Sequence, residues 1–161
     1  MDPLVEQSKK NSEAGVKRRD TDAAVRLLNA AIIDEKTPVF WSLVIARVTA
    51  VCGEFREELP NDFRYHLSPV PQLNGFFLHG GGRLPRCILS AQLNLIARRV
   101  DLSERILYAR EDDPIPQLVS PVAITVGEKE ELIFRFQNGS FDTPDDLARA
   151  LIKYVLKFSN L

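Results

Sequence analysis

The chain has 161 residues, of which 45% are hydrophobic and 27% are charged, and its formal net charge is −1. This composition is ordinary for one globular domain with a substantial core. The near-zero net charge excludes a chain-wide field that would attract nucleic acid or membrane surfaces. Two cysteines, Cys52 and Cys87, are too few for a disulfide framework. We therefore expect a protein of the cytoplasm or of another reducing intracellular compartment.

Residues 1–20 differ from the rest of the chain. They mix basic and acidic residues with Ser, Asn and Gly and show no apolar periodicity. They are also too polar for a secretory signal peptide. The pattern predicts a flexible polar tail over residues 1–20, followed by a single α+β domain over residues 21–161.

Two helices are predicted after this tail. The first covers residues 22–35 and follows Thr21, which is a suitable N-cap. Thr37-Pro38 then supplies the N-cap and the first helical residue of a second helix, which ends at Leu59-Pro60. Its most apolar stretch, Val39 to Gly53, is shorter than the roughly 20 residues that span a bilayer. We interpret this stretch as a core helix and predict no transmembrane segment.

The middle of the chain has the pattern of strands. Short runs at residues 63–67 and 75–79 are bounded by Pro and Gly. Residues 87–100 allow two interpretations, because apolar residues alternate from Leu89 to Ala97, as in a strand, while others fit one helical face. We favour a strand, since five consecutive alternations seldom arise by chance.

The sequence continues with a turn at residues 101–104 and a further strand at 105–110. Residues 122–126 and 132–137 are β-branched and aromatic runs, typical of a hairpin with a longer loop. Thr143-Pro144 then begins a helix over residues 143–158. The predicted fold class is α+β, with two N-terminal helices, a mostly antiparallel sheet of about five or six strands and one C-terminal helix.

One short motif resembles catalytic machinery. His79-Gly80-Gly81-Gly82 follows an apolar run and is similar to the oxyanion-hole loop of lipases and esterases of the α/β-hydrolase family. That family also needs a Gly-x-Ser-x-Gly nucleophile motif and a histidine after it. The chain has no such motif. In that family the triad lies after the oxyanion-hole loop, but the chain's only histidines are His66 and His79, so no later histidine can act as the base. We therefore expect no enzyme activity, and we predict no cofactor and no metal site.

Charge is segregated along the chain. Between Arg83 and Arg110 six arginines stand against two acids, a net charge of +4, whereas residues 111–147 hold nine acids and two bases, a net charge of −7. Arginine without lysine suits bidentate contacts to carboxylate or phosphate. The arginines either present an anion-binding face to RNA, DNA or acidic lipid headgroups, or meet the acidic part of the chain within the sheet or between copies, or simply neutralise acids on neighbouring strands. The predicted anion- or partner-binding residues are Arg83, Arg86, Arg98, Arg99, Arg105 and Arg110.

These observations favour a non-enzymatic protein-binding or self-assembly protein, such as an adaptor, a chaperone-like module or a structural coat protein. Its expected partner is a protein, including its own copies. The alternative is nucleic-acid or anionic-lipid binding through an Arg-rich sheet face and the basic N-terminal tail. A third possibility is an enzyme or small-molecule carrier that uses the glycine-rich loop.

Overall fold

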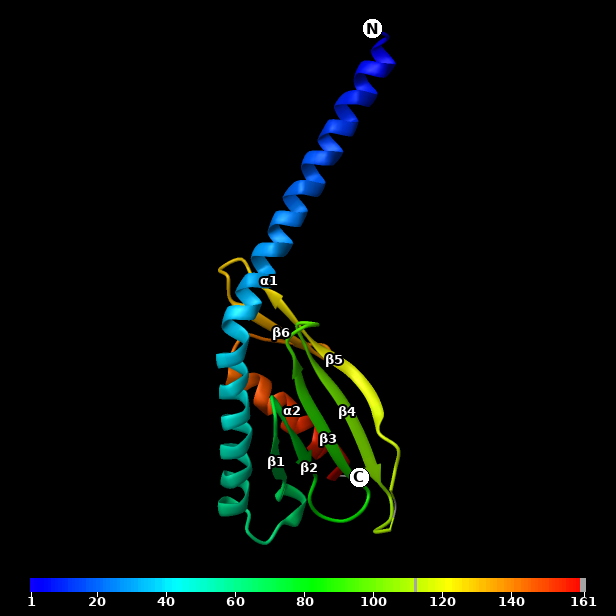
Figure 1. The fold of residues 1–161 in the computed structure, drawn as a ribbon. Coiled ribbons are helices and arrows are strands. Elements are labelled where there is room, and N and C mark those ends of the chain that lie inside the picture. The colour runs from blue at the N-terminus through cyan, green and yellow to red at the C-terminus, as the bar shows by residue number, and fades with distance from the viewer. Residues whose placement is uncertain (112, 160–161) are drawn as a thin grey trace.

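A single 56-residue helix, α1 (Pro3–Glu58), dominates the structure. Its N-terminal half projects as an isolated arm, and its C-terminal half packs against a seven-stranded antiparallel sheet (Figure 1). The computed structural model describes residues 1–111 and 113–159. The remaining elements are η1 (Phe63–Tyr65), β1 (Ser68–Gln72), β2 (Gly75–His79), β3 (Arg86–Asn94), β4 (Arg99–Leu107), β5 (Gln117–Val126), β6 (Leu132–Phe136), β7 (Gly139–Phe141) and α2 (Pro144–Ser159).

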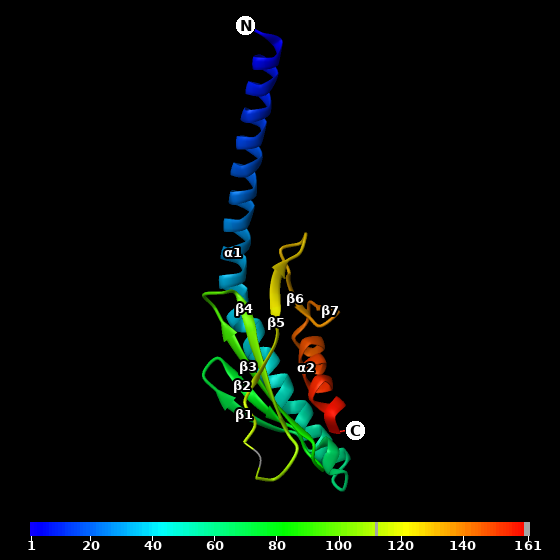
Figure 2. The same ribbon diagram turned by 90° about the vertical axis from the view of Figure 1, so that its right-hand side faces the viewer.

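The sheet is a meander in which every strand pairs with the next, in the order β1 to β7. Alternate residues of β3 are buried, which leaves one face of the sheet for the helices. The packed half of α1 and the whole of α2 cover this face and contact each other (Figure 2). The core between them includes Trp41, Val44, Phe76, Phe134 and Leu151. The α+β class predicted from the sequence is therefore confirmed.

The prediction of two N-terminal helices is wrong, because α1 continues through Pro38. Thr37-Pro38 has the composition of a helix start, yet Thr37 is buried in the middle of the helix and its hydroxyl bonds no described residue. Proline removes one backbone donor from a helix but need not end the helix when tertiary packing holds the turns before and after the proline. The expected tail over residues 1–20 lies in the exposed part of this same helix.

The sheet has more strands than the five or six predicted. β1 was missed because Pro69 and Pro71 argue against a strand. β1 is an edge strand, where a residue without a backbone donor is tolerated. β7 is only three residues long, and the run at 63–67 forms the short helix η1 instead of a strand.

Residues 87–100 are strand, as predicted, only as far as Asn94. The alternation that continues to Ala97 is misleading, since Ile96 is 94% exposed and Arg98 has a φ of +52° in a tight turn. The turn expected at residues 101–104 lies inside β4. The predicted strand at 105–110 overlaps only the end of β4.

The remaining predicted elements are confirmed. β2 has the expected bounds, and β5 and β6 form the expected hairpin. The Thr143 hydroxyl accepts a hydrogen bond of 3.2 Å from the Asp146 backbone N–H, so it caps α2 as predicted.

Candidate functional site

The six arginines singled out in the sequence do not form one surface. Arg83 and Arg86, from the β2–β3 loop and the start of β3, line a pocket. Arg98, in the β3–β4 turn, makes a bidentate ion pair with Asp34 of α1, with both N–O distances at 2.9 Å. The remaining three lie on or just after β4: Arg99, Arg105 and Arg110.

Two of these arginines have partners within the chain. Arg99 Nε lies 2.6 Å from an Asp101 carboxylate oxygen on the same strand. Hydrogen bonding from Arg98 holds the pKa of Asp34 below its usual value. Arg98 and Arg99 therefore neutralise acids of their own chain, but these acids lie on α1 and on the same strand, not on a neighbouring strand as one interpretation of the sequence had it. Arg105 and Arg110 are exposed.

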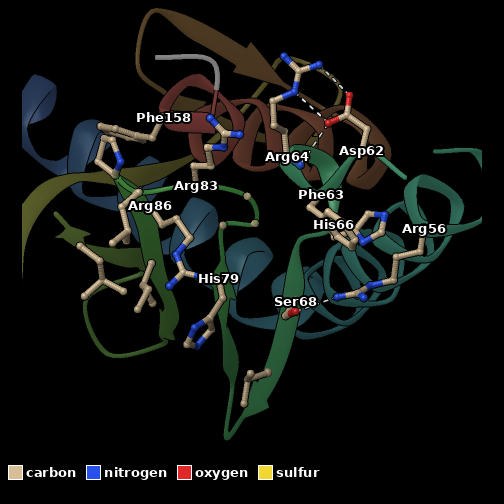
Figure 3. Close-up of a pocket in the computed structure, with 18 of the residues that line it drawn as sticks. Arg56, Asp62, Phe63, Arg64, His66, Ser68, His79, Arg83, Arg86 and Phe158 are labelled. Carbon is tan, nitrogen blue, oxygen red and sulfur yellow. Dashed lines mark hydrogen bonds and ion pairs between the residues drawn. The ribbon is translucent and has the colours of Figure 1, made fainter. Parts of the chain in front are cut away.

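The pocket that contains Arg83 and Arg86 has a volume of about 1180 Å³. It is lined by η1, the β2–β3 loop, neighbouring strand residues and the ends of both helices (Figure 3). Its wall carries four arginines and two histidines, and Asp62 is the only acid among the described residues that line it. The basic side chains are Arg56, Arg64, Arg83, Arg86, His66 and His79.

These basic groups differ in whether acids or hydrogen-bond acceptors of the chain already pair with them. Arg64 is held in a bidentate pair by Asp62, at 2.9 and 2.7 Å. Arg56 donates to the Ser68 hydroxyl at 2.8 Å. Within the described part of the chain, no acid pairs with Arg83 or Arg86, and the buried Nε of Arg86 has no hydrogen-bond partner. The pocket therefore holds positive charge that the protein itself does not neutralise.

His79 stands beside Arg86 on one wall of the pocket (Figure 3). Burial, and then the positive charge of Arg86, lower the pKa of His79 below its usual value. The imidazole is therefore neutral at pH 7 and offers hydrogen bonds without adding charge.

The glycine run beside His79 has a packing role. A Cβ on Gly81 would clash with the Phe63 carbonyl oxygen and would lie 2.7 Å from that of His66. Gly82 has a φ of +80°, in the left-handed region that favours glycine. The loop joins β2 and β3, and its glycines allow it to pack directly on η1.

Both cysteines of the chain are buried. Burial raises the pKa of Cys87 to about 12 and that of Cys52 to about 11, so both thiols are protonated at neutral pH. No group of three or more metal-ligating side chains occurs among the residues that the structure describes.

A second feature is the outer face of α1, which we define by Val25, Leu28, Val39 and Leu43. These side chains are between 50% and 66% exposed. They lie on the side of the helix opposite to Trp41, Val44 and Val48, which face the sheet. Val25, Val39 and Ala46 follow a seven-residue spacing typical of a helix that packs along another helix. Ile32, at the same spacing, is 8% exposed and lies in the core of its own chain.

Two shallow grooves flank this outer face, where α1 passes the start of α2. Leu43 lines both grooves. Charged side chains of both signs edge them: the acids are Glu35, Asp142, Asp145 and Asp146, and the bases are Lys36, Arg47 and Arg149. The projecting arm, residues 3–28, carries six bases and four acids, a net charge of +2.

The same part of α1 is also apolar enough to resemble a membrane span. Among the described residues, α1 is the one helix that is long and apolar enough, by length and composition, to cross a membrane. Of its most apolar 18-residue window, 22% is buried. The sequence interpretation as a core helix holds for one face of α1 only, because the opposite face is exposed.

The sequence patterns predicted neither the pocket nor the outer face of α1 as a single surface. The pocket brings Arg56 and Arg64 beside Arg83 and Arg86 from separate elements, and no local spacing predicts that meeting. The outer face did leave a signal, namely the seven-residue spacing of Val25, Val39 and Ala46.

Compared with models of protein families, with curated proteins and with solved structures, the chain matches none. The roles of its residues are therefore inferred from their geometry and chemistry.

Proposed function

We propose that this chain is a non-enzymatic assembly protein that pairs with a second copy of itself through the outer face of α1. The observation that carries this proposal is an apolar helix face that no described part of its own chain covers. Burying apolar surface contributes roughly 25 cal/mol per Å², so two such faces gain stability by covering each other.

A helix is the partner that best fits this face. Val25 and Val39, two heptads apart on this face, are β-branched, and β-branched residues at heptad spacing favour two-stranded helical packing. Farther along α1, Ala46 and Ala50 are small and exposed, so a second helix backbone can approach closely.

Charge favours an antiparallel arrangement of the two copies. In that orientation the basic arm of each copy lies along residues 29–58 of the other, which hold five acids and three bases, a net charge of −2. In a parallel arrangement the two basic arms would meet and repel. The arm and the packed half of α1 each have close to 28 residues, about 40 Å at 1.5 Å per residue, so they match in length. A two-fold pair of this kind leaves no copy of the interface open to a third chain. Such closed two-fold dimers are the commonest homo-oligomers.

Solution mass tests the proposal. Sedimentation equilibrium of the full chain should give a dimer, and Val39→Lys with Leu43→Lys should give a monomer with an unchanged circular dichroism spectrum. The matched control is Ile115→Lys with Leu118→Lys, which alters two aliphatic residues that are 85% and 93% exposed away from α1. This control should remain dimeric. A monomeric wild type at high concentration would refute self-assembly.

Crosslinking tests the orientation. In an antiparallel pair centred between residues 33 and 34, Leu28 lies opposite Val39. A chain carrying both Leu28→Cys and Val39→Cys should form a disulfide-linked dimer on oxidation. Chains that carry either substitution alone should not. Efficient crosslinking through Leu28→Cys alone would show a parallel pair.

The same variants address the alternatives. If the wild type is monomeric, and binds neutral phosphatidylcholine vesicles only while Val39 and Leu43 are intact, the outer face contacts a bilayer instead of a second copy. If a monomeric wild type binds nucleic acid or anionic vesicles, and removal of residues 1–20 abolishes that binding, the alternative of polyanion binding replaces assembly.

A further inference from the structure

The pocket between η1 and the β2–β3 loop carries an inference that is independent of self-assembly. We propose that it binds the phosphate group of a phosphorylated small molecule, with Arg83 and Arg86 as the principal contacts. Arg56 and neutral His79 complete the polar wall.

Charge is the first argument. Asp62, the single acid among the described lining residues, is already paired with Arg64. Arg56, Arg83 and Arg86 therefore leave a net positive charge around the pocket. A phosphate monoester carries a charge of about −1.5 to −2 at pH 7, so it offsets more of this charge than a carboxylate does.

The second argument is an unmet hydrogen bond. The Nε of Arg86 is buried, and no hydrogen-bond acceptor lies within reach among the described residues. An unpaired buried donor is unfavourable, and guanidinium groups bind phosphate through two parallel N–H donors. An oxyanion beside Arg86 and His79 would satisfy this group (Figure 3).

The third argument is the size and composition of the pocket. Its volume of about 1180 Å³ is far greater than one phosphate fills and is close to the upper range of small-molecule sites. Phe63, Leu84 and Phe158 supply apolar lining. The rest of the ligand is therefore apolar or aromatic, and phenyl phosphate is a suitable probe.

Isothermal titration calorimetry with phenyl phosphate tests the site. Arg83→Gln with Arg86→Gln should weaken binding at least about tenfold, because each lost bond is to a charged group. The matched control, Arg18→Gln with Arg135→Gln, removes two exposed arginines outside the pocket and should bind like the wild type. Equal affinity in the two double variants would overturn the proposal.

Two further measurements keep the test decisive. If the glutamine variant does not fold, Arg83→Lys with Arg86→Lys keeps the charge but loses the planar fork, and it should still bind more weakly than the wild type. Phosphorus NMR of the wild type should show line broadening of phenyl phosphate. Absence of both heat and broadening at millimolar concentration would overturn the proposal without any variant.

Additional probes distinguish the source of the phosphate group. Wild-type binding to phosphatidylinositol-phosphate vesicles that phenyl phosphate displaces would identify a lipid headgroup, and binding to phenyl phosphate alone would identify a free metabolite. Both results support the site. A single-stranded oligonucleotide that binds more tightly than phenyl phosphate, and depends equally on Arg83 and Arg86, would overturn the small-molecule assignment. Val39→Lys with Leu43→Lys should leave phenyl phosphate binding unchanged, which separates this pocket from the outer face of α1.

Discussion

The two faces of α1 differ in environment although their residues alternate within one short sequence. Leu43 is 53% exposed, whereas its neighbour Val44 is completely buried against the sheet. Residues 39–53 are apolar nearly all round, so composition alone cannot tell which side meets the sheet. A single sheet covers only one side of a helix. The outer face of α1, which the sheet does not cover, therefore needs a different explanation, and the proposed self-association supplies one.

The largest expected effect comes from placing the same charge on each face in turn. Val44→Asp would bury a carboxylate without a partner in the core, at a cost of about 4 kcal/mol or more. That is a large part of the roughly 5–15 kcal/mol that stabilises a typical domain. Urea unfolding should show a strongly destabilised or unfolded chain.

Leu43→Asp is the matched change on the adjacent residue. Because Leu43 is exposed, the unfolding free energy of the monomer at high dilution should change by less than about 0.5 kcal/mol. Its effect should appear instead in the solution mass at higher concentration. Equal destabilisation by the two substitutions would mean that both faces of α1 are buried within one chain.

A second prediction concerns Pro38, in the middle of α1. Its missing N–H leaves the Asp34 carbonyl without the usual helical donor, and an interior proline costs about 3 kcal/mol. Pro38→Ala should therefore stabilise the chain by about 1–2 kcal/mol, once the greater freedom of the unfolded alanine chain is subtracted. Thermal unfolding should show a higher melting temperature.

The control for Pro38 is Pro144, the first residue of α2. A proline there removes a donor that has no partner in a helix in any case, so Pro144→Ala should give little or no gain. If Pro38→Ala destabilises the chain as much as it was expected to stabilise it, the helix does not pass through residue 38 in the way described.

The contrast between the helices also explains what the sequence could reveal. α2 was predicted because every signal lies within it: the Thr143 cap, a proline in the first turn and one apolar stripe that ends in buried Leu151 and Val155. α1 contains a strong start signal at Thr37-Pro38 that tertiary packing overrides. β1 contains two prolines that only its place at the edge of the sheet makes acceptable.

The candidate pocket was predictable only in part. Arg83, Arg86 and the glycine run are close in sequence, so local composition drew attention to them. Arg56 lies in the last turn of α1 and Arg64 in η1, and their meeting with the other two arginines in the pocket depends on the whole fold. Charge counting could not separate these arginines from Arg98, which meets Asp34 across 64 residues of sequence.

The smallest expected effect is at Arg98, which links the packed half of α1 to the β3–β4 turn. The pKa of Asp34 lies below its usual value, chiefly because Arg98 donates hydrogen bonds to it. A carboxyl with a lowered folded pKa contributes stability that is present above its unfolded pKa and is lost as the pH falls through the folded pKa. Arg98→Gln should therefore lower the melting temperature by no more than about 2 °C near pH 6, because the pair is exposed. The difference from wild type should vanish as the pH falls through the lowered pKa of Asp34, and it should shrink in ~1 M NaCl. Asp34→Asn should have the same effect, and combining the two should add nothing further. A pH-independent loss in Arg98→Gln would instead trace the effect to the turn itself, where residue 98 has a positive φ.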